Sequence, residues 1–395
     1  MKRLIYKEIF LHLSQKQISL IIGARQVGKS TILKQLHEEI KNSELVFSFS
    51  LENKQICKLL NDNPENIFQL IPQPQNQRIV VLIDEIQYLD DPSNFLKLNY
   101  DTYQEKLKFV VTSSSSFYID RKFKDSLAGR KRIFELSTLS LQEMLHFRQR
   151  DELIQYINSD NIPLLYLDEL KKYLYEYLVF GGYPEVVLAE DVQEKKLILK
   201  ELGTSYAKKD AVESNLNIAD VYLNLLKLLA TRTGSLLNVN SLSSDIAVDN
   251  KTIENYLWVM SKSFHIDLVR PFFKNISSEL KKMPKVYFND LGLRNYFANN
   301  FSGIGMREDK GELLENYVYL VLKQKYGSDS IRYWRTQTKK EVDFVVYGDN
   351  GKNKAFEVKF NKKSYNKSKY MNFTTNYPDI PLNCIDLESV LVNKL

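Results

Sequence analysis

The stretch GARQVGKS, residues 23–30, lies between the apolar run ISLII (18–22) and the helical pattern TILKQLHEEI (31–40). It fits the pattern G-x-x-x-x-G-K-S/T, whose glycines let the backbone curl so that its N–H groups converge on phosphate oxygens. The helix after the loop adds the positive end of its dipole. A strand, this loop and a helix in succession therefore predict an α/β domain that holds a nucleotide phosphate.

The residues of this loop have expected parts in binding ATP and Mg²⁺. Lys29 would neutralise the β- and γ-phosphates, and the hydroxyl of Ser30 would hold the magnesium ion. An ordinary glycine turn is the alternative, but the strand and helix on either side favour nucleotide binding. The expected nucleotide contacts are Gly23, Ala24, Arg25, Gln26, Val27, Gly28, Lys29, Ser30 and Thr31.

Two acidic residues follow a second apolar strand. The segment RIVVLIDEIQ (78–87) runs through apolar residues into Asp84 and Glu85. Carboxylates at the carboxyl end of a parallel strand emerge beside the phosphate site of a doubly wound sheet. We expect Asp84 to support Mg²⁺ and Glu85 to orient or deprotonate the attacking water. Alone, the pair would be two solvated acids at a strand exit; together with the glycine loop it predicts ATP hydrolysis.

Two further positions are candidates for sensing the nucleotide. The run FVVTSSSSF (109–117) ends a predicted strand in hydroxyl groups. Thr112, Ser113 or Ser114 could contact the γ-phosphate, and Ser114 is the candidate we adopt. Arg130 is a candidate arginine finger, acting in its own subunit or in a neighbour. A plain turn and a surface arginine are the alternatives.

Length and pattern predict several domains. The chain has 395 residues, of which 44% are hydrophobic and 26% charged, the balance of a globular protein. After the first 150 residues the pattern becomes helical, and a helix, turn, helix and strand then outline a winged helix. The predicted parts are a P-loop α/β domain over 1–150, a helical linker or lid over 151–215, a winged-helix-like domain over 216–280 and a C-terminal α/β domain over 285–395.

Strand alternation in the C-terminal part gathers charged residues. In EVDFVV (341–346) Asp343 alternates with apolar residues, and in AFEVKF (355–360) Glu357 and Lys359 do the same. The turn-rich link between these strands predicts a hairpin. Its apolar faces would pack on a helix, and its three charged side chains would converge on one exposed surface.

Two carboxylates and a lysine are what metal-assisted phosphodiester cleavage needs. Asp343 and Glu357 would hold Mg²⁺, and Lys359 would steady the attacking water or the developing charge. Glu315, on the preceding helix, would complete the acid set. The run KNKAFEVKFNKKSYNKSKY (352–370), with seven lysines and one acid, would attract a phosphate backbone. A solvated hairpin face with an ion pair is the alternative, which the spacing alone favours.

The net charge and the cysteine content indicate where the protein is located and what it binds. The net charge of +6 is a weak indication of polyanion binding, and Cys57 and Cys384 form no metal-binding or disulfide pattern. No apolar run is long enough to span a bilayer. We therefore expect a cytoplasmic protein without a membrane partner. The helix DNKTIENYLWVMSK (249–262) lacks the basic surplus of a groove-reading helix, so the winged-helix-like part fits protein contact or packing.

The chain resembles a known family, the prokaryotic AAA+-like ATPases with a C-terminal DUF4143 region. The resemblance implies a P-loop domain of the additional-strand, catalytic-glutamate type, a winged helix and a PD-(D/E)XK nuclease-like fold. It also implies that Glu315, Asp343, Glu357 and Lys359 fall on the nuclease motif. Similar members often carry glycine where Ser113 stands, a departure that bears on the sensor. The resemblance covers nearly the whole chain and rests on GARQVGKST, VVLIDEIQ, FVVTSSSSF, LAGRKRIFELSTLSLQEM, GGYPEVV, LLATRTGSLLNVNSLSSDIAVDNKTIENYL, PKVYFNDLGLRNYF, GELLENYVYLVL, RTQTKKEVDFVV and FEVKF.

Three functional hypotheses follow from the sequence. The first is a Mg²⁺-dependent ATPase whose nucleotide state gates a C-terminal nuclease-like domain that binds DNA or another nucleic acid. The second is a nucleotide-switched module whose nuclease fold is inactive and serves docking. The third is a regulator that binds a protein partner. The sequence leaves open whether the protein forms a homo-oligomer.

Overall fold

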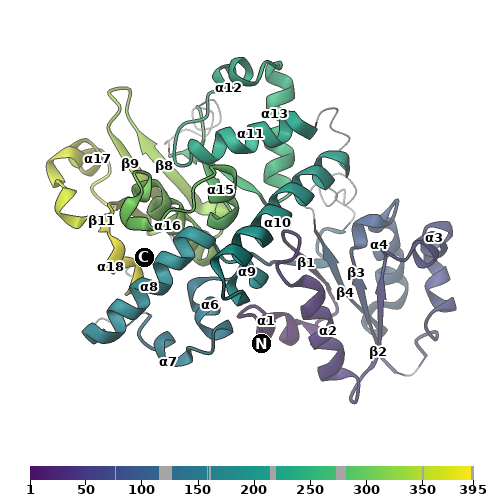
Figure 1. Ribbon diagram of the computed structural model, residues 1–395. Helices are drawn as coiled ribbons and strands as arrows, with labels where there is room; N and C mark the ends of the chain where they lie inside the picture. Colours follow the sequence, from purple (N-terminus) through teal and green to yellow (C-terminus); the bar gives the residue numbers. More distant parts are fainter. Residues whose placement is uncertain are drawn as a thin grey trace. The chain divides into compact units, whose positions relative to one another are not determined.

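In a computed structural model, the chain forms two compact units (Figure 1). The first comprises residues 1–138 with 262–264, and the second comprises 139–261 with 265–395. The main segment of the first unit runs to residue 138, and the second unit contains nearly all of the three segments predicted after residue 150. The finer four-part division stays a prediction. The residues that the structure describes are 1–75, 77–114, 127–157, 159, 162–213, 219–272, 282–348 and 351–392.

A parallel sheet forms the centre of the first unit. Its strand order is β2-β3-β4-β1-β5, and every pair of neighbours is parallel. The strands are β1 (Ile18–Ile22), β2 (Leu45–Ser50), β3 (Ile79–Asp84), β4 (Leu107–Ser113) and β5 (Lys131–Glu135). The helices are α1 (Tyr6–Leu11), α2 (Lys29–Ile40), α3 (Lys54–Asp62) and α4 (Pro92–Tyr103), with 3₁₀ turns η1 (His12–Ser14), η2 (Pro64–Gln69), η3 (Ile86–Tyr88) and η4 (Gln104–Lys106).

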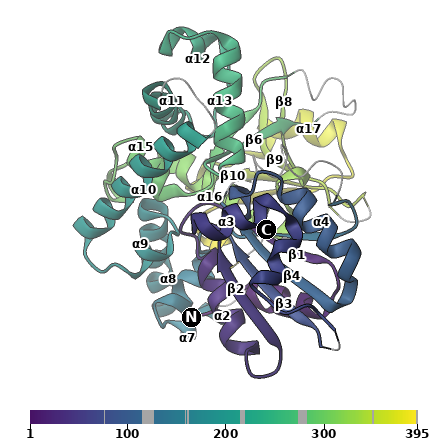
Figure 2. The same cartoon turned by 90° about the vertical axis from the view of Figure 1, so that its right-hand side faces the viewer.

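Helices cover both faces of this sheet, which is why nearly all residues of its inner strands are buried. Leu20 of β1 and Phe109 of β4 lie in one cluster with Phe95 of α4. The other face is covered by α2, whose Ile32 and Leu36 are buried. Figure 2 shows α2 and α4 on opposite sides of the strands. The parallel sheet that the apolar runs predict is thereby confirmed.

Strand β4 lies between β1 and β3. The strand that leads into the glycine loop and the strand that ends in Asp84 are therefore separated by one strand, as the family resemblance implies. The edge strand β5 is not predicted by the sequence patterns, because most of its residues are exposed or half-buried and it lacks a continuous apolar run. Residues 115–117 of the predicted serine run lie outside the described residues.

The second unit joins a helical part to a second sheet. Its helices are α6 (Leu141–Phe147), α7 (Asp151–Ile154), α8 (Leu164–Phe180), α9 (Pro184–Leu188), α10 (Val192–Glu213), α11 (Ala219–Thr231), α12 (Val239–Ile246), α13 (Asn250–Lys262), α15 (Leu291–Phe297), α16 (Lys310–Tyr326), α17 (Met371–Asn376) and α18 (Leu387–Leu391). Its 3₁₀ turns are η6 (Ile304–Met306), η7 (Ser328–Ser330), η9 (Lys362–Ser364) and η10 (Lys367–Tyr370). Across the described ranges, no helix combines the length and the apolar character needed to cross a membrane.

The second sheet has six strands in the order β11-β10-β9-β8-β6-β7. The predicted helix, turn, helix and strand are present as α12, α13 and β6, with the turn between the two helices. Strand β6, however, also pairs in parallel with β8, so the winged-helix-like segment and the C-terminal part share one sheet. The strands are β6 (Ile266–Pro271), β7 (Lys285–Phe288), β8 (Ile331–Arg335), β9 (Glu341–Val346), β10 (Lys354–Val358) and β11 (Leu382–Ile385).

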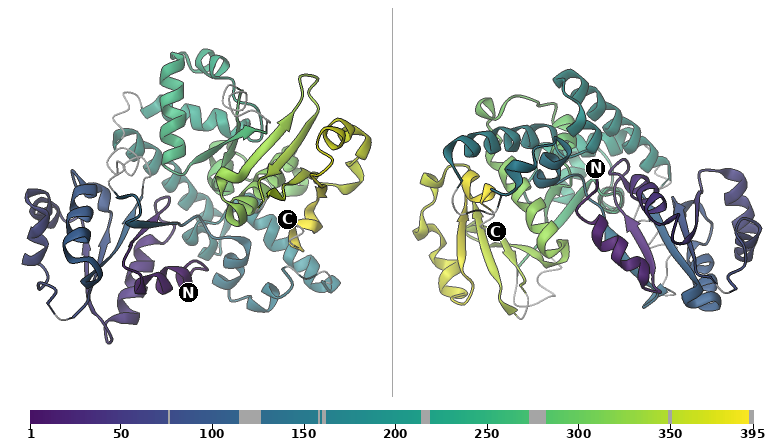
Figure 3. Two further views of the ribbon diagram at one scale, coloured as in Figure 1. Left: turned by 180° about the vertical axis from the view of Figure 1, so that it is seen from behind. Right: turned by 90° about the horizontal axis from the view of Figure 1, so that it is seen from below.

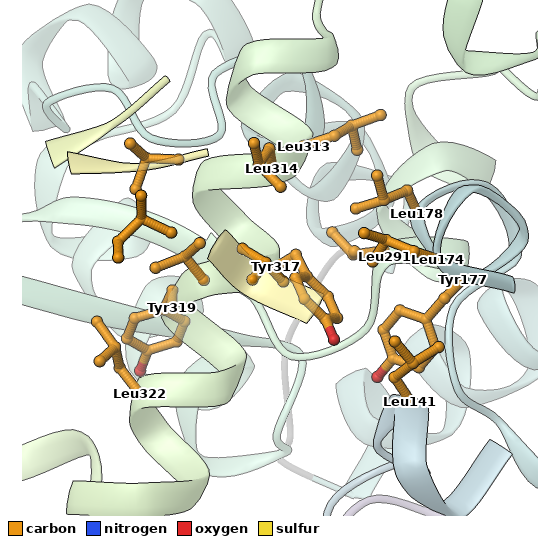
Figure 4. Packing of buried hydrophobic residues seen from close by; sticks show 14 of the residues in the cluster. Leu141, Leu174, Tyr177, Leu178, Leu291, Leu313, Leu314, Tyr317, Tyr319 and Leu322 are labelled. Carbon is orange, nitrogen blue, oxygen red and sulfur yellow. The ribbon is translucent and has the colours of Figure 1, made fainter. Parts of the chain in front are cut away.

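The main core of the second unit lies around α16. Figure 4 shows Leu313, Leu314 and Tyr317 of this helix near Leu174 and Leu178 of α8. The right-hand view of Figure 3 shows α16 along one face of the sheet. Because burying apolar area contributes about 25 cal/mol per Å², this shared cluster gives the helical part and the sheet a common source of stability.

The predicted hairpin is confirmed, but one strand is irregular. Strands β9 and β10 pair antiparallel, with Phe344 opposite Phe356. On the other side of β9, Arg332 pairs with Val345 and Trp334 pairs with Val342. Three steps along β9 therefore match two along β8, as in a β-bulge around Asp343. Strict alternation, on which the sequence prediction relies, does not hold across this point.

Candidate functional sites

Glycines shape the loop that connects β1 to α2. Gly23 has φ +157°, and a Cβ atom there would lie 2.1 Å from the carbonyl oxygen of Leu136. Gly28 has a left-handed conformation, with φ +103°, and is the N-cap of α2. A side chain is strained at φ +103°, which accounts for glycine at this position. The loop thus ends where the backbone N–H groups of the first helical turn are free of helical partners.

The predicted phosphate-binding lysine is the first residue of α2, directly after this loop. Lys29 is 4% exposed, and its Nζ donates hydrogen bonds to the carbonyl oxygens of Gly23, at 3.0 Å, and Ala24, at 2.7 Å. Ser30 and Thr31 follow in the first turn of α2. The residues between Ala24 and Gly28 form the rest of the loop; they are Arg25, Gln26 and Val27, with Gln26 in a left-handed conformation at φ 57°.

An arginine that the sequence analysis did not single out supports the loop from outside. Arg3 is buried, and its guanidinium donates to the carbonyl oxygen of Val27 at 2.7 Å and to that of Ser137 at 2.9 Å. It therefore links the loop to the segment after β5. Nothing in the local sequence around Arg3 indicates this contact.

The predicted acids lie at the carboxyl end of β3, beside β4. The hydroxyl of Thr112 donates to Oδ1 of Asp84. The backbone N–H of Glu85 donates to the same hydroxyl at 2.9 Å. Thr112, which the sequence offered as one of three sensor candidates, thus orients the two acidic residues.

Glu85 is held by two side chains. It has φ 58° and ψ 53°, a left-handed conformation that is uncommon for a residue with a side chain. Ser114 donates to its Oε2 at 2.8 Å, and Gln87 donates to the same oxygen. Gln87 also donates to Ser114 at 2.9 Å and is 3% exposed. Gln87 was not predicted, although it stands in the motif DEIQ, two residues after Glu85.

Arg130 lies at the other end of the sheet. Its carbonyl accepts from the backbone N–H of Ile18, the first residue of β1, whereas the glycine loop follows the last residue of β1. A five-residue strand spans about 15 Å. The guanidinium of Arg130 is paired with Asp101, with Nε to Oδ1 at 2.7 Å. An arginine finger acting on its own subunit does not fit this position, which leaves a finger that acts on a neighbour or a surface arginine.

Asp343 and Glu357 lie on adjacent strands of the second sheet. Oδ2 of Asp343 accepts from the backbone N–H of Val358 at 2.8 Å. Oε1 of Glu357 accepts from the hydroxyl of Tyr370 at 2.7 Å and from Nζ of Lys359. Burial raises the pKa of Asp343 well above its usual range, as do the negative charges of Glu315 and Glu357. The pKa of Glu357 is also raised by burial, against the effect of Lys359.

The predicted exposure of this group is wrong. Asp343 is 7% exposed and Glu357 is 4% exposed. The sheet is covered on both sides: Phe344 and Phe356 pack in the large core around α16, and a smaller cluster lies on the opposite face. That cluster contains Phe272, Trp334, Val342, Val345, Ala355, Tyr370, Phe373 and Ile380. Apolar residues outside the hairpin, which no local pattern connects to it, remove its acidic residues from solvent.

A buried lysine on β7 completes the group and was not predicted. Nζ of Lys285 lies 3.1 Å from Oε1 of Glu315 and 3.8 Å from Oδ1 of Asp343, and it also pairs with Glu341. The hydroxyl of Tyr287 donates to the same oxygen of Glu315 at 2.6 Å. Burial alone would lower the pKa of Lys285, but these carboxylates outweigh it and raise the pKa.

The lysine-rich segment after β10 is exposed. Within it Asn361 caps η9 and Asn366 caps η10, each accepting a backbone hydrogen bond at 3.0 Å. No carboxylate of the described residues forms an ion pair with the lysines of these two turns. They are Lys362, Lys363, Lys367 and Lys369.

The donor set fits a divalent cation at one position. Oε2 of Glu357 is buried and has no hydrogen-bond partner, and carboxylate oxygens are the ligands that Mg²⁺ prefers. Within the described ranges, no group of three or more His, Cys, Asp or Glu side chains is arranged to hold a metal ion. Glu357 is thus the residue of this site that has an unused carboxylate oxygen for such a cation, and Asp343 lies on the adjacent strand.

Two family models match the N-terminal and the C-terminal parts of the chain. Residues 15–145 match the model described as an AAA domain, and residues 310–390 match that of the domain of unknown function DUF4143. The chain carries an AAA domain and a DUF4143 domain. Residues 171–303, between them, match the domain of unknown function DUF8612. The AAA match contains the glycine loop, and the DUF4143 match contains Glu315, Asp343 and Glu357.

Relatives cover most of the chain. The uncharacterized protein MJ1544 of Methanocaldococcus jannaschii is 26% identical over 99% of this chain and 86% of its own length. The uncharacterized protein Rv2008c of Mycobacterium tuberculosis is 23% identical over 88% of this chain and 71% of its own.

Among solved structures, the replication initiator DnaA bound to AMPPCP and single-stranded DNA matches with a TM-score of 0.30 and 15% identity, covering 65% of this chain and 86% of that one. The Holliday junction branch migration motor RuvB of Thermotoga maritima matches with a TM-score of 0.29 and 15% identity, covering 70% and 94%.

Proposed function

We propose that the AAA domain of this chain is a Mg²⁺-dependent ATPase whose nucleotide state controls the C-terminal domain. The observation that carries the proposal is the tethering of Glu85. Both side-chain hydrogen bonds to this residue reach Oε2, and they come from Ser114 and Gln87. Oε1 accepts none from the described residues and is available to orient a water molecule. Glu85 follows β3, and Lys29 follows the glycine loop after β1.

Each residue has a defined part in the proposed hydrolysis. The N–H groups of the first turn of α2 and the ammonium of Lys29 would bind the phosphates. Ser30 and Asp84 would hold Mg²⁺, which neutralises phosphate charge when bound. Glu85 would orient the attacking water. Ser114 and Gln87 fix the carboxylate of Glu85, so little reorganisation is needed before the chemical step.

Calorimetry and phosphate release test the ATPase. Wild type should bind ATP with Mg²⁺, and Lys29→Ala should lose at least tenfold in affinity. Glu85→Gln should keep the affinity within threefold and lower the turnover at least a hundredfold. Lys34→Ala, an exposed position on α2, is the control for removing a lysine. Equal hydrolysis by wild type and Glu85→Gln would refute the role of Glu85.

We further propose that the C-terminal domain is a nuclease-like domain that binds nucleic acid and one divalent cation. Asp343 and Glu357 would hold the cation, which polarises a phosphodiester and activates water when bound. Lys359, 30% exposed in its side chain and paired with Glu357, would contact the phosphate. The exposed lysines of η9 and η10 follow Lys359 along the chain and would hold the phosphate backbone.

Cleavage and retention assays separate the two parts of this proposal. Single- and double-stranded DNA and RNA would be incubated with the protein and Mg²⁺ or Mn²⁺, with and without ATP. Asp343→Ala should abolish cleavage and leave ATP affinity within threefold. Replacing Lys363 and Lys367 by Ala should weaken retention and make it less dependent on salt. Cleavage that survives Asp343→Ala would refute the nuclease site.

The burial of the carboxylates favours a second candidate function. Asp343 and Glu357 are each less than a tenth exposed, and Oε1 of Glu357 already accepts from Lys359 and Tyr370. A domain built this way could dock nucleic acid or a protein without cutting it, under control of the ATPase. Salt-sensitive DNA retention with no cleaved product under any of these conditions would favour this switch. A stable complex with protein and no DNA retention would favour a regulatory role.

A further inference from the structure

Lys285 lies among carboxylates where a second metal ion would otherwise be expected. We infer that its ammonium group takes the place of that ion, so that the C-terminal carboxylate site accepts a single divalent cation on Asp343 and Glu357. This inference rests on the metal role proposed above for those two residues. In this inference Lys285 is a positioning residue, and the partner of Glu315 is the ammonium group of Lys285 and not a metal ion.

The first support is the surroundings of Lys285. The residue is 2% exposed, and its Nζ lies within ion-pair distance of Glu315, Glu341 and Asp343. The ring of Tyr333 lies 5.8 Å from the same Nζ. A buried ammonium is tolerated only where opposite charges compensate the loss of water. Here three carboxylates share one cation, which is the part a metal ion plays in a two-metal site.

The charge balance of the whole group limits the number of metal ions. The acids are four, and the lysines and arginine paired with them are three, which leaves one net negative charge when all are ionised. One divalent cation turns this into one positive charge. A second would leave three positive charges in a largely buried group, which is costly in a medium of low polarity. The acids are Glu315, Glu341, Asp343 and Glu357, and the cations are Lys285, Arg335 and Lys359.

The free oxygen atoms point to the same conclusion. Oε2 of Glu357 is buried without a partner. Oε1 of Glu315 accepts from Lys285 at 3.1 Å and from Tyr287 at 2.6 Å, much as Oε1 of Glu357 accepts from Lys359 and Tyr370. The buried oxygen without a partner thus belongs to Glu357, and both donors to Glu315 come from β7. The sequence pattern predicts Glu315 as a metal ligand; in this inference it anchors the ammonium that replaces one.

Counting bound manganese tests the inference on the full-length protein without nucleotide. Mn²⁺ would be titrated and followed by electron paramagnetic resonance, with Glu357→Gln as the reference that lacks the site. Wild type should bind one more equivalent than Glu357→Gln. Lys285→Met should bind two more, and the charge-conserving Lys285→Arg should bind one. A single equivalent in folded Lys285→Met, or two in wild type, would overturn the inference.

A second variant does not depend on the folding of Lys285→Met. Glu315→Gln should keep the Mn²⁺ affinity within threefold of wild type, whereas Glu357→Gln should lose at least tenfold. Equal losses in the two variants would make Glu315 a ligand and refute the assignment. If wild type showed no manganese binding that depends on Glu357, both this inference and the proposed metal site would fail. If manganese bound but the number of equivalents differed from the numbers given above, the inference about Lys285 would be refuted and the proposed metal site would stand.

Discussion

The hydroxyl of Ser114 donates a hydrogen bond of 2.8 Å to Oε2 of Glu85. The sequence predicts that Ser114 contacts the γ-phosphate, and that contact stays a prediction. What the structure adds is a direct link from the end of β4 to the candidate catalytic carboxylate. Gln87 contacts both residues, so the three side chains form one hydrogen-bonded group.

Ser114→Ala should therefore slow ATP hydrolysis more than it weakens ATP binding. The carboxylate of Glu85 would lose one of two donors, and we expect turnover to fall about tenfold, which corresponds to about 1.4 kcal/mol in the barrier. The KM for ATP should stay within threefold. Steady-state phosphate release measures both. Ser14→Ala, at an exposed position, is the matched control; an unchanged turnover in Ser114→Ala would contradict the link.

Gly23→Ala should destabilise the first unit. An added Cβ would lie 2.1 Å from the carbonyl oxygen of Leu136, so the backbone of the loop or of the segment after β5 must move. We expect a loss of at least ~2 kcal/mol in the free energy of unfolding. Urea denaturation measures it. Gly305→Ala, where the added atom meets nothing within 4 Å, should cost less than about 1 kcal/mol. Similar losses at both positions would refute the steric argument.

Lys108 should make stability depend on pH in the alkaline range. It is 1% exposed, donates to the carbonyl of Gln17 and pairs with no carboxylate of the described residues. Burial, with a smaller effect of Arg78, lowers the pKa of Lys108 to about 7. Between that pH and the ordinary lysine value the unfolded chain binds the extra proton, so stability should rise with pH.

Lys108→Met should therefore be more stable than wild type at pH 6. The expected gain in the free energy of unfolding is a few kcal/mol, the order of magnitude that corresponds to the lowered pKa of Lys108. The difference should shrink as the pH rises towards about 10. Thermal unfolding across this range is the measurement, and Lys106→Met, at an exposed neighbouring position, is the control. A difference that stayed constant with pH would show that Lys108 is compensated in the folded state.

Asp309 should stabilise the second unit at neutral pH. It accepts from Arg307 at 2.8 Å and from Arg294, both of which are buried. Burial alone would raise the pKa of Asp309, but these two hydrogen bonds lower it to about 2. The stabilisation is present above the ordinary pKa of an aspartate and is lost as the pH falls towards 2.

Asp309→Asn should cost ~3 kcal/mol at pH 7, because it leaves two buried guanidinium groups without a counter-charge. The cost should fall as the pH approaches 2. Chemical denaturation at pH 7 and pH 3 measures the change. Asp329→Asn, in a 3₁₀ turn before β8, is the control. A cost at pH 3 as large as at pH 7 would rule out the charge as its source.

The predictions from sequence succeeded where the signal is local and failed where distant residues decide. The glycine loop, the strand ending in Asp84 and Glu85, and the β9–β10 hairpin follow from the order of residues within a few positions. The exposed surface expected for Asp343 is wrong because a second apolar cluster covers that face of the sheet. Arg130 could not be located from sequence, because its end of the sheet depends on how β5 pairs with β1.

By itself, the sequence determined the glycine loop and strands β1 to β4 of the AAA domain, because glycine geometry and the burial of apolar runs are properties of short segments. Only the tertiary structure decided which charges neighbour one another. Lys285 reaches Glu315, 30 positions further along the chain, through the pairing of β7 in the sheet and the packing of α16. Electrostatic surroundings depend on distance in space and on burial, and neither is encoded in the spacing of residues along one strand.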